Sequence, residues 1–419
     1  MMELKKYNAN HTKVLKINQI VRTVSETHRF DKDKLIAINT SDVENGVMGS
    51  GTLTSVDELK GQFKKTIVKD DILFSEIRPA NRRFAKVTTE DTKDYVVSTK
   101  LMVLRKYNED VDLEYFYYCL TNQPFLDILQ RRAENRIGSF PQITFDLLSE
   151  YAFPIPPISE QKRISSVIST LDKKIALNRA INQNLEAMAK QLYDYWFVQF
   201  DFPNKDGKPY KSSGGEMVWN EKLKRMIPKE WTNANIYQLA SISKETVNPQ
   251  AQPNELFKHY SLPEYDKTGT YAEEYGIDIQ SAKFIVTNNC ILVSKLNPWT
   301  SRVICGNRES NQICSTEFVV WNPASLKTKG FLFMLAKSAK FIEYCTQGAT
   351  GTSHSHRRIN PELMMKFDFP YNSEIAIKFS RLIENIIGKL HDNIAQLKIL
   401  TKQRDELLPL LMNGQITIE

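Results

Sequence analysis

The sequence predicts an α+β protein in which two similar globular α/β domains, related by a pseudo-twofold, are separated by two long helices that form an antiparallel coiled coil. Three observations predict this architecture. The chain repeats itself at an offset of about 215 residues, each repeat runs into a long stretch with heptad spacing, and each such stretch follows a proline-containing segment. We expect a first domain at 1–155, a first helix at 156–200, a second domain at 201–370 and a second helix at 371–419.

The repeat consists of matched landmarks that occur in the same order in both halves. Residues 72–79 (ILFSEIRP) match residues 291–298 (ILVSKLNP), and both indicate a strand that ends in a loop, because proline cannot continue a β-ladder. The later matches pair Ser98-Thr99 with Ser315-Thr316, β-type runs 100–104 with 317–321, helical stretches 113–129 with 329–344, polar glycine loops 136–139 with 349–352, and Phe153-Pro154 with Phe369-Pro370. An internal repeat therefore explains the sequence better than chance.

The two long stretches carry apolar residues at steps of three and four, which is heptad spacing. A single apolar stripe more often packs on its own domain. A helix of about 40 residues, however, reaches roughly 60 Å and so needs a partner beyond a small domain. The economical solution is that the two helices pair with each other, with an asparagine on each seam fixing the register. The predicted seam comprises Ile168, Leu171, Ile175, Asn178, Leu185 and Leu192 in the first helix, and Leu382, Ile386, Leu390, Asn393, Leu397 and Leu400 in the second.

Serine followed by glutamate stands near the start of both helices, at Ser159-Glu160 and Ser373-Glu374. This pattern predicts a serine cap oxygen and an anion at the positive end of each helix. The aromatic string at 193–200 ends the first helix, where we expect it to close the helix pair or dock a partner rather than stack on bases.

Composition sets limits on the class of protein. Of 419 residues, 41% are hydrophobic and 25% are charged, as in ordinary globular proteins, and 56 Lys and Arg against 49 Asp and Glu leave a net charge of +7. This mild excess favours nucleic acid weakly. The five cysteines form no C-x-x-C pair, so we expect reduced, mostly buried thiols. Neither a signal peptide nor a membrane span is evident, and we expect a cytoplasmic protein with no membrane partner.

Several motifs that suggest chemistry have simpler interpretations. Asn297-Pro298-Trp299 is like the Asn-Pro-Pro-aromatic motif of amino-methyltransferases, but it lacks the second proline and no glycine-rich cofactor loop precedes it. The run 46–51 lacks G-x-G-x-x-G spacing, and no Walker loop is present. A polar loop explains His354 and His356 better than a metal site does. We therefore predict no catalytic residue, no metal and no cofactor in this chain.

With this order of parts, the chain resembles the specificity subunit of type I restriction-modification systems over essentially its whole length. The segments that carry the resemblance are 153–161 (FPIPPISEQ), 210–217 (YKSSGGEM) and 227–231 (IPKEW). The resemblance implies that each globular domain is a target recognition domain, that the two read a bipartite asymmetric sequence in double-stranded DNA, and that the helices set the gap. It also implies two methyltransferase subunits with S-adenosylmethionine and adenine chemistry, and two motor-nuclease subunits that use ATP and Mg.

Irregular polar loops after the matched strands are the candidates for DNA contact, because donors and acceptors must reach base edges while Lys and Arg meet phosphates. An ordinary solvated turn is the alternative for each residue. Arginine is the preferred candidate because its fork can read guanine or clamp phosphate. The candidates are Arg78, Asn81, Arg82, Arg83, Arg136, Ser139 and Gln142 in the first half, and Lys295, Asn297, Thr300, Arg302, His354, His356, Arg357 and Arg358 in the second.

Two other functions stay open on the sequence. A fused methyltransferase-nuclease remnant is disfavoured by the missing cofactor and metal motifs. A coiled-coil adaptor without a DNA role predicts no salt-sensitive binding to duplex DNA.

Overall fold

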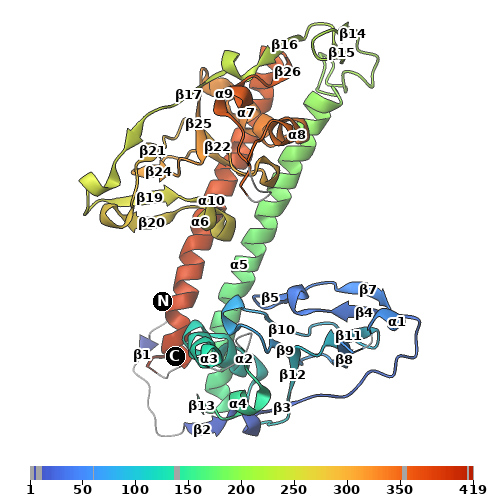
Figure 1. Cartoon of the computed structure of the whole chain (residues 1–419), viewed down its shortest axis with the longest axis vertical. Coiled ribbons are helices and arrows are strands. Elements are labelled where there is room, and N and C mark those ends of the chain that lie inside the picture. The colour runs from blue at the N-terminus through green and yellow to red at the C-terminus, as the bar shows by residue number, and fades with distance from the viewer. Residues whose placement is uncertain are drawn as a thin grey trace. The chain divides into compact units, whose positions relative to one another are not determined.

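The computed structural model describes residues 4–5, 12–59, 61–135, 142–351, 356–412 and 415–418. The chain divides into two compact units (Figure 1). Unit 1 consists of Met1–Ile175 and Ile399–Glu419, and unit 2 consists of Ala176–Lys398. Both units combine sheets with short helices and with part of each long helix, so the prediction of an α+β fold with two globular parts and two long helices is confirmed.

Unit 1 contains two four-stranded sheets. The first is antiparallel and has the order β10 (Phe84–Lys86), β9 (Ile72–Ser75), β12 (Leu101–Lys106), β3 (Val21–Thr23). The second has the order β7 (Thr52–Ser55), β4 (Lys34–Ile38), β11 (Tyr95–Ser98), β8 (Phe63–Lys65), in which β4 and β11 are parallel. Two-stranded ladders pair β2 (Lys13–Lys16) with β13 (Ala152–Ile155), β5 (Val43–Glu44) with β6 (Val47–Met48), and β1 (Leu4–Lys5) with β27 (Thr417–Ile418).

Unit 2 repeats the plan of the two sheets, with one further strand in its second sheet. Its antiparallel sheet has the order β23 (Val303–Cys305), β22 (Ile291–Ser294), β25 (Phe318–Pro323), β17 (Ala240–Ile242). Its second sheet has the order β20 (Ala272–Tyr275), β19 (Leu256–Tyr260), β24 (Gln312–Cys314), β21 (Lys283–Ile285), β18 (Thr246–Val247), and β19 and β24 are again parallel. The ladders are β16 (Thr232–Asn235) with β26 (Asp368–Tyr371) and β14 (Met217–Asn220) with β15 (Arg225–Pro228). The matching order confirms that the sequence repeat is a structural one.

Each predicted helical stretch is two helices rather than one. Unit 1 has α2 (Leu113–Thr121) and α3 (Gln123–Glu134), separated at Asn122, whose side chain accepts a bond from Phe125 N at 2.9 Å and restarts the helix. Unit 2 has α7 (Lys329–Ala336) and α8 (Ala339–Gln347), and Ser338 caps the N-terminus of α8 by accepting a bond from Phe341 N. The other helices are α1 (Val56–Leu59), α4 (Phe145–Ser149), α6 (Leu262–Thr268) and α9 (Pro361–Met365).

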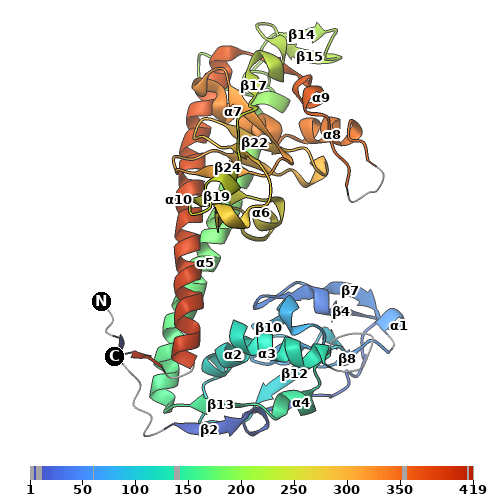
Figure 2. The same ribbon diagram turned by 60° about the vertical axis from the view of Figure 1, so that its left-hand side comes forward.

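The two long helices are α5 (Ile158–Tyr193), which continues into a π-helical turn η5 (Asp194–Val198), and α10 (Ser373–Met412). In unit 2 they lie side by side and antiparallel (Figures 1 and 2), because Asn178 Nδ2 donates to Gln396 Oε1 and Asn393 Nδ2 donates to Asn182 Oδ1, both at 3.0 Å. In unit 1, Arg404 of α10 bonds Asp172 of α5 at 3.3 Å. The seam asparagines therefore bond across the pair, although not to each other.

The seam is buried or half-buried at the predicted positions except near the start of α10. There Leu382 is exposed, and Ile383 and Ile387 lie in the core instead. The placement of Leu382 on the seam was wrong, because this part of α10 packs on the globular part of unit 2 rather than only on α5. The predicted serine caps are also wrong. Both serines lie inside their helices, and Asn372 caps α10 by accepting from Ile375 N at 3.1 Å.

Each unit has its own hydrophobic core, and the long helices contribute to both. In unit 1, Ile164 and Ile168 of α5 and Leu411 of α10 join the main cluster. In unit 2, the aromatic string that ends α5 is buried: the ring of Phe197 lies 4.7 Å from that of Phe331 and 5.0 Å from that of Phe379. The string thus closes the helix pair onto the unit 2 core, as predicted, and does not form a base-stacking strip.

No helix in the described part of the chain is long and apolar enough to cross a membrane. All five cysteines are buried and free of disulfides, as predicted. Among the described residues, no group of three or more His, Cys, Asp or Glu side chains is placed to hold a metal ion.

The Asn182–Asn393 bond generates a test of the helix pairing. We expect Asn182→Ala and Asn393→Ala each to lower the free energy of unfolding by about 1 kcal/mol, because each leaves a half-buried amide without its partner. The double variant should lose less than the sum, measured by urea unfolding. Asn184, exposed on α5, provides the control: Asn184→Ala should show no coupling to Asn393→Ala. Strictly additive losses at 182 and 393 would contradict the bond.

Candidate nucleic-acid interface

A short turn with the same backbone follows the second strand of each antiparallel sheet. Turn 1 (78–82) links β9 to β10 around the 3-10 helix η4 (Pro79–Asn81), and turn 2 (297–301) links β22 to β23 around η9 (Pro298–Thr300). The amide of residue 82 bonds the carbonyl of Pro79 at 3.0 Å, and that of residue 301 bonds Pro298 at 3.0 Å. We call these the paired turns.

Both ends of each paired turn lie in the left-handed region of backbone space. The φ angles are 46° at Arg78 and 53° at Arg82 in turn 1, and 48° at Asn297 and 49° at Ser301 in turn 2. Side chains other than glycine adopt this conformation at a cost of about 1 to 3 kcal/mol and keep it only where the surroundings impose it. Here a buried proline follows the first of these residues, and a helix packs on each turn, α3 on turn 1 and α8 on turn 2.

A distant segment joins each turn at the strand end. Ile143 N donates to Glu76 O at 2.7 Å in unit 1, and Ile359 N donates to Lys295 O at 3.0 Å in unit 2. A single antiparallel β-bridge extends each contact, between Ile77 and Gln142 in unit 1 and between Leu296 and Arg358 in unit 2. The segments at 142–143 and 358–359, which follow the two polar glycine loops in the sequence, thus lie beside the strand ends that lead into the paired turns. The candidates Arg136, Ser139 and His354 lie outside the described residues.

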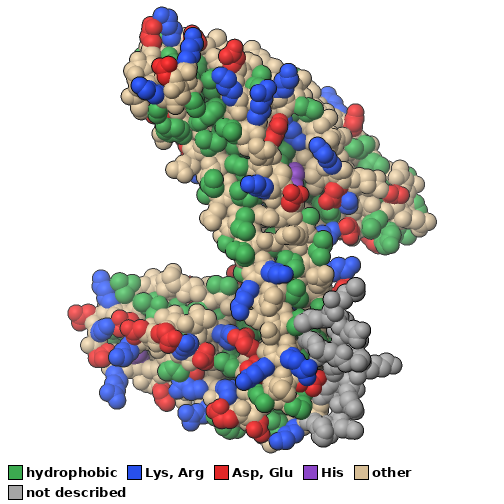
Figure 3. Space-filling view, turned by 180° about the vertical axis from the view of Figure 1, so that it is seen from behind, with side chains coloured by type: hydrophobic (Ala, Val, Ile, Leu, Met, Phe, Trp, Pro, Cys, Tyr) green, Lys and Arg blue, Asp and Glu red, His purple; other side chains and the backbone are tan. Residues whose placement is uncertain are grey.

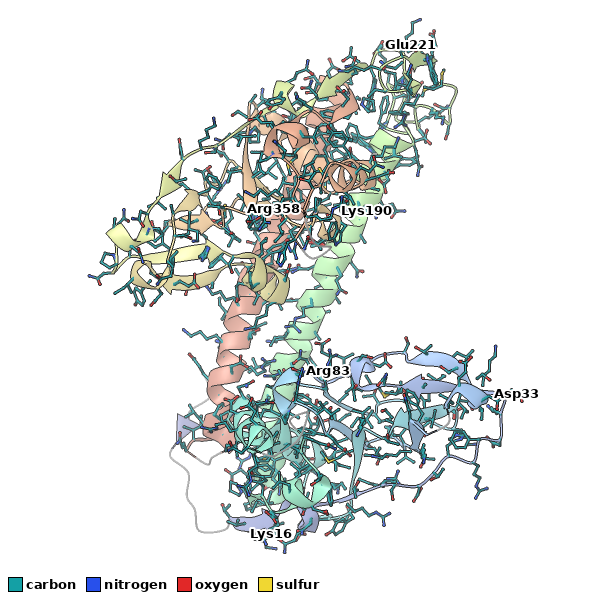
Figure 4. All side chains as sticks on the ribbon, viewed as in Figure 1. Lys16, Asp33, Arg83, Lys190, Glu221 and Arg358 are labelled. Atoms are coloured by element: carbon teal, nitrogen blue, oxygen red, sulfur yellow. The ribbon has the colours of Figure 1, made fainter. Side chains whose placement is uncertain are left out.

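The side chains at these equivalent positions exchange their charges. Unit 1 has Glu76 and Lys100 where unit 2 has Lys295 and Glu317, and in both units the backbone N of the first residue donates to the carbonyl of the second. A third side chain completes each cluster: Gln142 Nε2 donates to Glu76 at 2.8 Å, whereas the Arg358 fork donates twice to Glu317, at 2.9 and 3.1 Å. The bonds to Glu317 raise the pKa of Arg358 (labelled in Figure 4).

Two of the predicted arginines of unit 1, Arg82 and Arg83, bond to other groups of the protein. Arg82 Nη1 donates to Gln123 at 2.6 Å, and its guanidinium lies 5.7 Å from the ring of Phe84. Burial, and then the charge of Arg404, lower the pKa of Arg82. Arg83 (labelled in Figure 4) donates to the carbonyl of Ser41 at 3.2 Å and pairs with a glutamate on β5. These two side chains hold turn 1 against the rest of unit 1.

Turn 2 is held in the same way. Arg302 makes two bonds to Asp266, at 2.5 and 2.7 Å, and a third to Thr300 at 2.6 Å. Arg357 donates to the carbonyl of Ala349 at 2.5 Å, and its amide donates to Asn297 Oδ1 at 3.2 Å. Asn297 therefore serves the backbone here, which fits the rejection of a methyltransferase motif at 297–299.

The structure thus separates the candidates into two groups. Those with exposed side chains are Arg78, Asn81, Thr300, His356 and Arg358, and those half-buried are Arg82, Arg83, Gln142, Lys295, Asn297, Arg302 and Arg357. Four residues of this region were not predicted as site residues: the acceptors Glu76, Glu317 and Asp266, and Trp299, which is exposed. The two glutamates could have been found by aligning the repeats, which shows the exchange of charge at 76/295 and 100/317.

Charge on the molecular surface is mixed. Among the described residues on the face shown in Figure 3, Lys and Arg side chains are interspersed with Asp and Glu and form no continuous basic field. Any attraction to phosphate from this face is therefore local, and particular side chains rather than net charge must set it.

The strained backbone of turn 2 generates a test. Asn297→Ala and Asn297→Gly remove the same side-chain contacts, but only alanine keeps a Cβ at a φ of 48°. We expect the alanine variant to unfold with a free energy about 1 kcal/mol lower than the glycine variant, because the left-handed conformation disfavours a Cβ. Thermal and urea unfolding measure the difference. Equal stabilities would show that the position is unstrained.

Comparisons with known proteins agree with this geometry. Residues 13–187 match the family "Type I restriction modification DNA specificity domain". The chain is 29% identical to the type I restriction enzyme HindI specificity subunit of Haemophilus influenzae, over 96% of this chain and 98% of that one. It is 24% identical to the MjaIX specificity subunit of Methanocaldococcus jannaschii, over 73% of this chain and 69% of that one.

One solved structure supports the fold. The crystal structure of a type I restriction-modification system S subunit from M. genitalium aligns with a TM-score of 0.60 and 15% identity, over 97% of this chain and 98% of that one. Residues 13–187 are thus similar to a type I restriction modification DNA specificity domain, and over nearly its whole length the chain is similar to the HindI specificity subunit.

Proposed function

We propose that this chain is the DNA-reading specificity subunit of a type I restriction-modification complex. The observation that carries the proposal is the duplicated frame: two units present the same strained turn and the same strand-end bridge, but with different side chains at equivalent positions. The same backbone with different donors and acceptors is what reading two different base sequences requires. Each unit then reads one part of a bipartite, asymmetric target.

We infer that the exposed candidates contact DNA and that the half-buried candidates hold the exposed ones in position. Arg78 and Arg358 are the foremost candidates for base or phosphate contacts, because each presents an exposed guanidinium beside a paired turn. Two bonds to Glu317 hold Arg358, so the protein itself orients its guanidinium. Arg82, Arg302 and Arg357 would act by fixing the turns. The candidates that lie outside the described residues, Arg136, Ser139 and His354, stay proposals of the same kind.

The remaining parts of the chain would serve assembly. We assign target recognition to 1–155 and 201–370 and spacing to the helices at 156–200 and 371–419. Because the cross-pair bonds of Asn178 and Asn393 fix the helix register, the helices would set the gap between the two parts of the target. Two methyltransferase subunits with S-adenosylmethionine would methylate adenine, and two motor-nuclease subunits with ATP and Mg would cleave, so that catalysis resides in the partners and not in this chain.

The decisive experiment has two steps. Sequencing the methylated adenines in cells that express the chain with its methyltransferase partner should reveal one bipartite motif. The full chain should then bind a duplex carrying that motif more tightly than a scrambled duplex, with affinity that falls steeply as salt rises. Unchanged methylation in cells without the chain, or no binding to either duplex, would leave a coiled-coil adaptor as the better interpretation.

The contact made by Arg78 has a specific test. If Arg78 reads a base, Arg78→Ala should cost about 1 to 3 kcal/mol on the target duplex and relax specificity at one position of the unit 1 half-site. If it clamps a phosphate, binding should weaken equally on all sequences and the salt dependence should decrease by about one charge. The matched control is Arg22→Ala, an exposed arginine on β3 at the other edge of the same sheet. Equal effects of both substitutions would refute the assignment of turn 1.

A further inference from the structure

Trp299 is a large apolar side chain that turn 2 holds in the solvent. It occupies the middle of η9 and is 42% exposed, although its neighbour Pro298 is buried. The backbone around it is fixed by left-handed residues at both ends and by the Thr300 N to Asn297 O bond at 3.0 Å. The indole is therefore presented on a rigid support rather than on a loose loop.

The fold does not require this ring. Its counterpart in turn 1 is Ala80, and turn 1 has the same 3-10 helix, the same left-handed ends and the equivalent Asn81 N to Arg78 O bond at 2.8 Å. A small side chain at this position is thus compatible with the turn. Leaving an indole in water forfeits the free energy that its burial would contribute, so stability of the turn does not explain the residue.

The polar groups around Trp299 are already occupied. Thr300 Oγ1 donates to Asn297 O at 2.8 Å, and Arg302 is held by Asp266 and by Thr300. Asn297 Oδ1 accepts from the Arg357 amide at 3.2 Å, so this oxygen is used within the protein. The surface that the middle of turn 2 offers to a ligand is mainly the face and edge of the indole.

We propose that Trp299 is a specificity-determining residue that makes an apolar contact with a base in the half-site read by unit 2. This inference rests on the proposed function and deepens it. An indole can meet DNA by stacking on an exposed base face or by contacting the methyl group of thymine, and both contacts are apolar. Ala80 of unit 1 has no ring with which to stack on a base, so the two units would differ in the chemistry of recognition as well as in sequence.

The test compares variants of the full chain on the duplex that carries the methylated target. Trp299→Ala should weaken binding about tenfold or more, as the loss of one aromatic contact with a base does. Trp299→Phe should retain most of the affinity. The matched control is Trp219→Ala, which removes an indole that is 53% exposed on β14 in the same unit, and it should bind as the unsubstituted chain does. Thermal unfolding checks that all three variants remain folded.

Two modified duplexes distinguish the kinds of contact. In a duplex with 2-aminopurine in the half-site, a stacking ring should change the fluorescence of that base when the unsubstituted chain binds. Binding of Trp299→Ala should leave the fluorescence unchanged. With uracil in place of thymine, a methyl contact should weaken binding of the unsubstituted chain and leave Trp299→Ala unaffected. Either result supports the inference.

The outcomes also separate this inference from the proposed function. If the unsubstituted chain binds the target duplex and Trp299→Ala binds it equally well, the inference is overturned and the DNA-reading role stands. If Trp299→Ala binds DNA normally but fails to assemble with the methyltransferase subunits, the ring docks a protein and the inference is again overturned. If the unsubstituted chain binds no duplex, both fail.

Discussion

The backbone bond from Ile143 to Glu76, with its counterpart from Ile359 to Lys295, is the constraint on which the candidate interface of each unit depends. It brings a segment that follows two helices in the sequence to the end of a strand in the antiparallel sheet. Without it, the polar side chains at 76 and 142, or at 295 and 358, would have no common backbone support. A bond between backbone atoms is independent of side-chain identity, so the frame can persist while the side chains on it change.

That independence explains how one backbone supports two surfaces. The turns are specified by proline, by left-handed residues and by helix packing, none of which uses the exposed side chains at their tips. Arginine at 78 and asparagine at 297 adopt nearly the same φ, although asparagine tolerates it better. Local strain is therefore retained at a place where the surface side chains differ between the two units. Backbone strain of this kind clusters at functional sites in proteins.

Much of the fold follows from the sequence because it depends on patterns that repeat. The internal repeat predicted the matched strands at 72–75 and 291–294, and the heptad spacing predicted the two long helices. The same spacing predicted that an asparagine on each seam takes part in the pairing of the helices. The partners of those asparagines were not: Asn178 meets Gln396 and Asn393 meets Asn182, a choice set by the stagger of two helices. Leu382 was misplaced because burial there depends on the globular part of unit 2, which a helical stripe does not report.

The site was less predictable than the fold, since the role of an arginine is decided by its neighbours. Arg78 and Arg302 are both arginines beside a paired turn, yet one is exposed and the other is forked onto Asp266 from a distant helix. No spacing in the sequence links 266 to 302. The exchange of charge between 76 and 295 was visible in the repeat, but its meaning required the third side chain that the strand-end bridge supplies.

The reciprocal charges couple neighbouring positions, so each residue limits which others can accompany it. Glutamate at 76 is compatible with lysine at 100 and an amide at 142, whereas lysine at 295 is compatible with glutamate at 317 and a guanidinium at 358. Moving one of these residues alone into the other half would set like charges together or leave a carboxylate without its donor. A single substitution at one of these positions is therefore disfavoured, and a change at either strand end requires matched changes at its neighbours.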